Sequence, residues 1–311
     1  MVNRHDIETA YARIAEHVRR TPLLESALPA GGAPISLKLE SLQHSGSFKA
    51  RGAFHNLLTR RAPPVGCATA SGGNHGAAVA YAASRLGIPA KIFVPSISSP
   101  AKIAKIRSYG ADIHIEGADY FDAQALCDAH VAATGALKIH PYDTPETIAG
   151  QGAVALEWEE DLARLGLARL DTVLVAVGGG GLISGVAAAL AGRVRVIAVE
   201  PEGAASMAAA FAAGRPVEAP IRSIAADSLG ARQIGALPFE ICRDRVERVV
   251  LVDDDAIRAA QRRLWQDFNL VAEPGGATAL AALASGAYIP AAGERLGVLV
   301  CGGNADLAAL S

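Results

Sequence analysis

The segment Ser45-Gly46-Ser47-Phe48-Lys49 places a lysine amine beside an aromatic ring in a run of small residues. Only six of the 29 basic residues are lysines, so the chain uses arginine at most positions where either residue would serve. An amine can form an imine with an aldehyde, whereas a guanidinium cannot. A cation in the first turn of a helix also opposes the helix dipole, so helix stability does not explain Lys49. Lys49 is therefore either a surface lysine at a helix start or a nucleophile for a carbonyl group.

A phosphate-binding loop is indicated by four glycines and a leucine that follow an apolar run and open a helix. They are Gly178, Gly179, Gly180, Gly181 and Leu182. Glycine lets the backbone approach an anion closely, and the free N–H groups of a helix N-terminus favour negative charge. The dinucleotide fingerprint fits poorly because it needs a third glycine at Ile183, and no lysine follows Lys138 to serve a P-loop. A packing turn without a ligand is the other interpretation.

A second loop of this kind precedes another predicted helix. It consists of Ser71, Gly72, Gly73, Asn74 and His75. Its backbone N–H groups could hold a carboxylate, and the Asn74 amide could donate to a ligand or accept from it. The alternative is that Ser71 or Asn74 only caps the helix.

The last predicted strand ends at Cys301, which two glycines and Asn304 follow. These glycines would let a flat ring pack against the backbone. A thiol in such a place is most often a small buried hydrophobic group, so Cys301 alone carries no function.

Short apolar runs alternate with helix-length segments, a pattern typical of mostly parallel sheets covered by helices. The predicted strands are residues 34–39, 67–70, 90–94, 112–115, 137–140, 172–177, 195–199, 246–252 and 297–300. The predicted helices are residues 5–19, 48–60, 75–86, 101–109, 120–133, 146–165 and 182–191, with one more after Asp253. Breaks at residues 61–66 and 141–145 predict a large domain, 1–65 and 145–311, and a smaller inserted domain, 66–144.

Composition excludes several classes of protein. Of the 311 residues, 51% are hydrophobic and 19% are charged, so the chain can bury a large core. The net charge of −2 provides no basic surface for nucleic acid. Four widely spaced cysteines argue against a disulfide scaffold and suit a reducing cytoplasm, and the charged N-terminus is no signal peptide. Two uncharged stretches, 172–192 and 274–293, are long enough for a membrane helix, but the first has four glycines at its centre and the second starts Pro-Gly-Gly. A buried strand, a glycine loop and a small-residue helix explain the first better, so no membrane is expected.

The sequence resembles the serine/threonine dehydratases and serine racemases that use pyridoxal 5′-phosphate. The matching segments cover nearly the whole chain in the family's order: 37–40 (LKLE), Gln43, 46–53 (GSFKARGA), 71–75 (SGGNH), 148–152 (IAGQG), 178–182 (GGGGL), 272–277 (AEPGGA) and 301–304 (CGGN). The resemblance implies fold type II, the tryptophan-synthase-β-like α/β fold with two open, mostly parallel sheets flanked by helices. It also implies a homodimer, and a small domain that moves to close the site.

The same resemblance implies a role for each motif. Lys49 would bind the cofactor aldehyde as an imine and later act as the base, with Phe48 beside the ring. Asn74 would hydrogen-bond the ring hydroxyl, and Cys301 would face the pyridine nitrogen. The loop 178–182 would bind the phosphate, and residues 71–75 would hold the substrate carboxylate.

The implied activity is loss of water from L-threonine or L-serine, which yields a 2-oxo acid and ammonia. Alternatives on the same scaffold are a dehydratase for phenylserine or 3-hydroxyaspartate, and a serine racemase. Racemases of this family have a serine two positions before the asparagine of the carboxylate loop, where this chain has Gly72. Alternatives from other classes are a non-catalytic binding protein and a Rossmann-type oxidoreductase.

Two departures from the family's pattern limit these implications. Many relatives bind a divalent cation through a Glu after a strand and an Asp six residues later, but here Glu200 is followed by Ser206. One hard carboxylate ligand is missing, so no metal is expected there. The chain ends at Ser311, so the regulatory domain of biosynthetic threonine dehydratases is expected to be absent.

Overall fold

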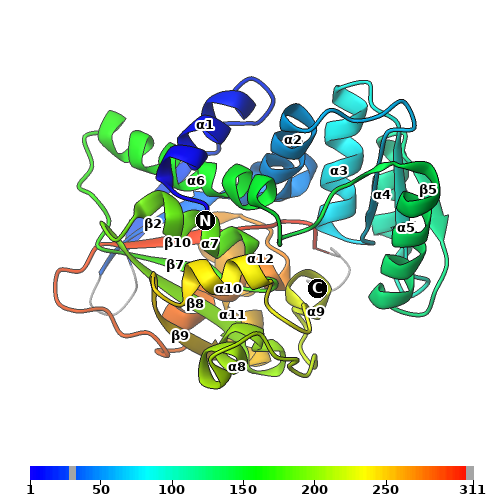
Figure 1. Ribbon diagram of the computed structural model, residues 1–311. Coiled ribbons are helices and arrows are strands. Elements are labelled where there is room, and N and C mark those ends of the chain that lie inside the picture. The colour runs from blue at the N-terminus through cyan, green and yellow to red at the C-terminus, as the bar shows by residue number, and fades with distance from the viewer. Residues whose placement is uncertain (28–32, 306–311) are drawn as a thin grey trace.

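The computed structural model describes residues 1–27 and 33–305 and contains two sheets flanked by helices (Figure 1). The larger sheet has six strands in the order β1-β2-β10-β7-β8-β9. Their bounds are β1 Leu23–Ala27, β2 Pro34–Leu39, β7 Thr172–Ala176, β8 Arg195–Pro201, β9 Val246–Val252 and β10 Leu296–Val300. All neighbours are parallel except β1 and β2, which pair antiparallel with Leu23 opposite Lys38.

The smaller sheet is parallel throughout and has the order β5-β4-β3-β6. Its strands are β3 Cys67–Ala70, β4 Ala90–Val94, β5 Asp112–Ile115 and β6 Leu137–Lys138. The helices between them are α3 Asn74–Arg85, α4 Pro100–Ser108 and α5 Tyr120–Thr134, on the right of Figure 1. All these strands fall within residues 66–144, while the exact domain boundaries and any domain movement stay predictions.

Nine further helices surround the larger sheet in the described part of the chain. They are α1 Arg4–Ile14, α2 Lys49–Thr59, α6 Pro145–Arg164, α7 Gly181–Leu190, α8 Ser206–Ala213, α9 Ala226–Leu229, α10 Ala236–Cys242, α11 Asp254–Phe268 and α12 Pro274–Ala284. Helix α7 packs on β7 and β8 and is covered by α6 and α1, whereas α12 packs along β7 to β10 with α11 against it. Single 3-10 turns occur at Glu40–Leu42, His44–Gly46 and Glu202–Ala204.

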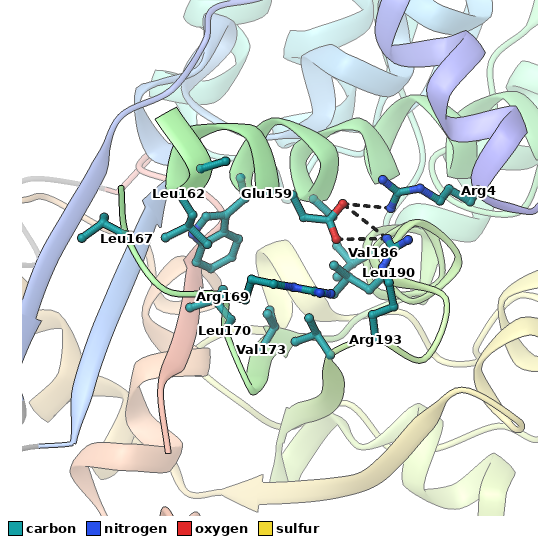
Figure 2. Close-up of a pocket in the computed structure, with 14 residues that line it drawn as sticks. Arg4, Glu159, Leu162, Leu167, Arg169, Leu170, Val173, Val186, Leu190 and Arg193 are labelled. Carbon is teal, nitrogen blue, oxygen red and sulfur yellow. Dashed lines mark hydrogen bonds and ion pairs between the residues drawn. The ribbon is translucent and has the colours of Figure 1, made fainter. Parts of the chain in front are cut away.

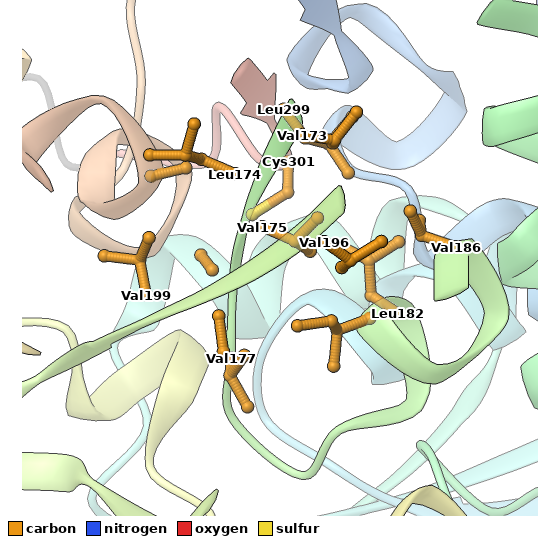
Figure 3. Packing of buried hydrophobic residues seen from close by; sticks show 14 of the residues in the cluster. Val173, Leu174, Val175, Val177, Leu182, Val186, Val196, Val199, Leu299 and Cys301 are labelled. Carbon is orange, nitrogen blue, oxygen red and sulfur yellow. The ribbon is translucent and has the colours of Figure 1, made fainter. Parts of the chain in front are cut away.

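Aliphatic side chains of the central strands form the main core (Figure 3). Every residue of β7 is buried, as expected for a parallel strand covered on both faces. Leu182 and Val186 of α7 pack into this cluster, and Cys301 joins it at the end of β10 (Figure 3). The core therefore fixes the start of α7 and the end of β10, two of the places where the sequence predicts ligand contacts.

Most predicted elements are present, with ends that differ by a few residues. The first helix ends at Ile14 instead of residue 19, because its last buried side chain is Ile14. The strand predicted at 137–140 shortens to Leu137–Lys138, because it pairs only with the four-residue strand β3 at the edge of its sheet. Within residues 1–27 and 33–305, no helix is long and apolar enough to cross a membrane.

Candidate active site

Lys49 is the first residue of α2, and the chain before it is fixed to the end of β10. Ser47 forms an isolated bridge with Gly302, and the Phe48 N–H donates to the Cys301 carbonyl over 3.1 Å. Two segments that are about 250 residues apart in the sequence are thereby placed side by side, as the sequence motifs predict.

A buried cluster of ion pairs holds the first turn of α2 in place. Arg51 donates to both carboxylate oxygens of Glu40 at 2.7 Å, and to Glu157 of α6 at 2.9 and 3.0 Å. Lys38 of β2 pairs with Glu157 at 2.7 Å and with Asp161 at 2.9 Å. All five side chains are buried, and removing one partner of such a cluster would leave an uncompensated charge. The cluster therefore ties α2 to β2 and α6.

The Lys49 amine lies close to a backbone carbonyl and an aromatic ring. Its Nζ donates to the Pro141 carbonyl over 2.7 Å and lies 5.1 Å from the centroid of the Phe48 ring. Burial of the amine lowers the pKa of Lys49 to about 8, because the charged form loses hydration. Near neutral pH, more of this amine is uncharged than in an exposed lysine, and the uncharged amine is the form that attacks a carbonyl carbon.

The glycine loop between β7 and α7 leaves backbone donors unused. The N–H groups of residues 179–182 make no hydrogen bond within the described parts of the chain. Gly180 has a φ of 89°, which glycine adopts without strain. A Cβ at Gly179 would lie 2.3 Å from the Tyr142 ring, so a side chain there would displace Tyr142. Free N–H groups at a helix N-terminus suit a phosphate.

A cavity joins the lysine to the glycine loop. The predicted site residues that line it are Phe48, Lys49, Asn74, Gly178, Gly179, Gly180, Gly181, Leu182 and Cys301. Further lining residues, which the sequence analysis missed, include Tyr142, Ser228, Leu229 and Glu273. Of the predicted carboxylate loop, Ser71, Gly72, Gly73 and His75 do not line this cavity.

Asn74 is held at the cavity by hydrogen bonds to two residues of distant segments. Its Nδ2 donates to Glu273, and its Oδ1 accepts from Asn304 over 2.6 Å. Burial raises the pKa of Glu273, against the opposing effect of the Asn74 donor. The feature of the sequence that could have indicated Glu273 is its position directly before Pro274, the first residue of α12.

The neighbours of Asn74 make contacts within the protein. The Ser71 hydroxyl accepts from the Gly73 N–H over 3.2 Å, so it closes a local turn. The His75 ring lies 3.1 Å from the Ile139 carbonyl, and burial lowers the pKa of His75 to about 3. His75 is therefore a neutral, buried side chain at neutral pH.

Cys301 is buried, with its Sγ 3.4 Å from the Gly275 carbonyl. Burial raises the pKa of the Cys301 thiol above its ordinary value, so the thiol stays neutral. A Cβ at Gly302 would lie 1.9 Å from Glu273 Oε1, so the glycine at this position makes room for the Glu273 side chain.

A profile of the family described as "Pyridoxal-phosphate dependent enzyme" matches residues 14–302, which contain the whole cavity lining. The chain belongs to this family. Its cofactor is accordingly pyridoxal 5′-phosphate, and the two-sheet α/β fold is that of fold type II.

The relatives of this family member catalyse more than one reaction. The chain is 42% identical to a phenylserine dehydratase from Ralstonia pickettii over 96% of its own length and 91% of the relative. It matches the structure of a T.th. threonine deaminase with a TM-score of 0.90 and 40% identity, covering 97% and 98% of the two chains. It matches maize serine racemase with a TM-score of 0.90 and 36% identity, covering 99% and 95%.

The residues of the cavity fit the cofactor of the family. The Lys49 amine suits the aldehyde, and the unused N–H groups of residues 179–182 suit the phosphate. The neutral Cys301 thiol and the Asn74 side chain line the same cavity.

Glu200 at the end of β8 caps helix α8 instead of facing a second acidic ligand. Its carboxylate accepts from the N–H groups of Met207 and Ala208 over 2.8 and 2.9 Å. The Ser206 hydroxyl donates to the Gly178 carbonyl over 3.1 Å, so Ser206 links this cap to the glycine loop. Burial raises the pKa of Glu200 to about 7, which further weakens it as a hard anionic ligand.

We expect EDTA treatment to leave most of the activity intact, because Glu200 lacks an acidic partner at Ser206 and is occupied by backbone donors. The measurement is the rate of 2-oxo acid formation by holoenzyme before and after chelation and gel filtration. A several-fold loss that Mg²⁺ restores, and that NaCl of equal ionic strength does not, would contradict this prediction.

Proposed function

We propose that this enzyme removes water from a β-hydroxy amino acid, L-threonine or L-serine, and releases a 2-oxo acid and ammonia. The observation that carries the proposal is Gly72, which stands where racemases of this family have a serine and has no side chain to move a proton. Racemisation needs an acid or base on each face of the α-carbon, whereas elimination needs a base on one face only.

In this proposal several residues that line the cavity have defined tasks. Lys49 would hold the cofactor through its amine, and the Lys49 Nζ would take the α-proton of the substrate. The loop 178–182 holds the phosphate through backbone N–H groups, and Asn74 orients the ring. The bound cofactor supplies an electron sink for the α-carbon. A neutral Cys301 thiol would not protonate the ring nitrogen strongly, which would limit that sink and favour prompt loss of the β-hydroxyl.

We also propose that residues 66–144 close over the bound substrate. Three contacts between this segment and the large-domain segments support the proposal: Asn74 with Glu273, Lys102 with Asp227, and Lys105 with Asn304. Because Asn74 belongs to both the proposed clamp and the cavity wall, closure would position the ring and the substrate carboxylate together.

A homodimer in the cytoplasm completes the proposal. The four free, buried cysteines suit a reducing compartment, and the homodimer rests on the family resemblance. Light scattering of the holoenzyme should give twice the chain mass of 31.9 kDa, and a monomer mass would refute the dimer.

A phenylserine dehydratase is the second candidate, because the phenylserine dehydratase from Ralstonia pickettii is 42% identical over 96% of this chain. A single assay separates the candidates. Holoenzyme is incubated with L-serine, L-threonine, phenylserine or 3-hydroxyaspartate, and 2-oxo acid formation is measured. The highest kcat/KM identifies the side chain that fits, and absence of 2-oxo acid from all four would refute the dehydratase proposal.

The double variant Gly72→Ser/Ser98→Gly should raise the share of racemisation. An added Cβ at Gly72 would lie 1.9 Å from Ser98 Oγ and 2.7 Å from Ser98 Cβ, so Gly72→Ser alone would collide with Ser98. Removing the Ser98 side chain makes room for the new hydroxyl. The ratio of D-serine to pyruvate should increase in the double variant and stay unchanged in the Ser98→Gly control. An unchanged ratio in both would show that position 72 does not control this partition.

A further inference from the structure

A second cavity, of about 400 Å³, lies away from the cofactor site, between α6, the C-terminal half of α7 and the segment that enters β7 (Figure 2). Its wall is mainly apolar and includes Trp158, Leu162, Leu170, Val173 and Leu190. Well-packed protein interiors contain few voids larger than a water molecule, whereas cavities of roughly 300–1,000 Å³ hold small organic ligands. The proposed reaction makes no use of this cavity.

Charged groups stand on one side of this cavity. Glu159 of α6 pairs with Arg4 at 2.8 Å and with Arg193 at 3.0 Å, and Figure 2 shows the carboxylate between the two guanidinium groups. Arg4 and Arg193 also donate to the Ala189 carbonyl in the last turn of α7, over 2.6 and 3.1 Å. Arg4 also pairs with Glu8 of its own helix at 2.9 Å, so two carboxylates balance the two guanidinium groups at this rim.

A third guanidinium, that of Arg169, has no such partner. Its side chain extends across the cavity toward Leu190 in Figure 2, and no carboxylate of residues 1–27 and 33–305 lies within ion-pair distance of it. Counting Arg4 and Arg193 with their partners Glu159 and Glu8, this side of the cavity has three positive and two negative charges, and Arg169 supplies the excess. An apolar wall with an excess of positive charge at one side selects a ligand that has an apolar body and a negatively charged head.

We propose that this cavity binds a small carboxylate with an apolar body, held by Arg169 over an apolar floor that includes Trp158. A guanidinium matches a carboxylate because its planar N–H groups can donate to both oxygens. One unpaired cation suits one negative charge, and the aliphatic and indole side chains suit an alkyl or aromatic body. The site is independent of the proposed reaction. It lies at the end of α7 opposite the glycine loop, about 15 Å away along a ten-residue helix.

Isothermal titration of the holoenzyme with 3-phenylpropionate tests this site without any turnover. The neutral amide of the same size, 3-phenylpropionamide, serves as the ligand control. We expect the carboxylate to bind, and the amide to bind roughly tenfold more weakly or worse, since a charge-assisted pair with guanidinium would be missing. Equal affinity for the two compounds, or no binding of the carboxylate, would overturn the proposal.

Two variants locate the bound probe. Arg169→Gln should weaken 3-phenylpropionate binding roughly tenfold. Arg262→Gln is the control, because it changes a different exposed arginine, which lies on α11, and it should leave 3-phenylpropionate binding unchanged. Leu167→Trp fills the mouth of the cavity and should also weaken binding. Unchanged affinity in Arg169→Gln and Leu167→Trp would place the probe elsewhere, including the cofactor site, and would refute this inference while leaving the dehydratase proposal untouched.

Discussion

Replacing Lys49 with alanine is expected to abolish turnover and the absorbance band of the bound cofactor. In the proposed mechanism the Lys49 amine both bonds the aldehyde and accepts the α-proton, and burial lowers the pKa of this cavity-lining amine to about 8. The loss should be complete within detection, since one side chain serves both steps. Lys91→Ala, which changes a partly exposed lysine of β4, is the matched control and should retain activity.

Covalent labelling tests the same assignment independently of activity. Borohydride reduction of the holoenzyme followed by peptide mapping should place the label on Lys49. A label on one of the other five lysines, or a normal absorbance band in Lys49→Ala, would contradict the assignment.

The Gly180→Asp variant is expected to lose pyridoxal phosphate. The substitution places a carboxylate in a loop whose free N–H groups and helix N-terminus favour an anion, so it would compete with the phosphate and repel it. Part of the loss of cofactor affinity would come from steric strain and not from charge. Gly180 has a φ of 89°, and a Cβ at this position would lie 2.7 Å from Pro238.

Gly180→Asn separates charge from strain. Asparagine has the shape of aspartate without its charge, and it tolerates a positive φ better than most residues. We expect cofactor affinity to fall much further in Gly180→Asp than in Gly180→Asn, measured by absorbance titration of apoenzyme, with similar circular dichroism for both variants. Equal cofactor affinities in the two variants would show that this loop does not bind the phosphate.

The sequence predicted the parallel sheets well because their strands are short apolar runs next to glycine-rich turns. It missed β1, an edge strand held only by an antiparallel ladder to β2, whose sequence LLESA has little periodicity. It also missed α12, because an uncharged segment that begins Pro-Gly-Gly looks more like a loop than a helix. Proline at the first helical position removes no hydrogen bond, and tertiary packing on β7 to β10 supplies the rest.

The candidate site was predictable where a motif carries its own chemistry, as with Lys49 and the glycine loop. Residues that reach the cavity through packing between distant segments were not. Tyr142 covers Gly179 only because the break after β6 lies over the start of α7, and Glu273 meets Asn74 only because α12 starts beside Gly302. Neither contact follows from spacing along the chain.

The most direct test of the proposed elimination is the partition of L-serine in a single reaction with holoenzyme. Pyruvate and D-serine are quantified together over the initial phase, before either accumulates enough to react further. Pyruvate should greatly exceed D-serine, because in the proposed mechanism Lys49 serves one face of the α-carbon and Gly72 has no side chain to serve the other. If D-serine forms as fast as pyruvate, the dehydratase proposal is wrong and the enzyme is a racemase.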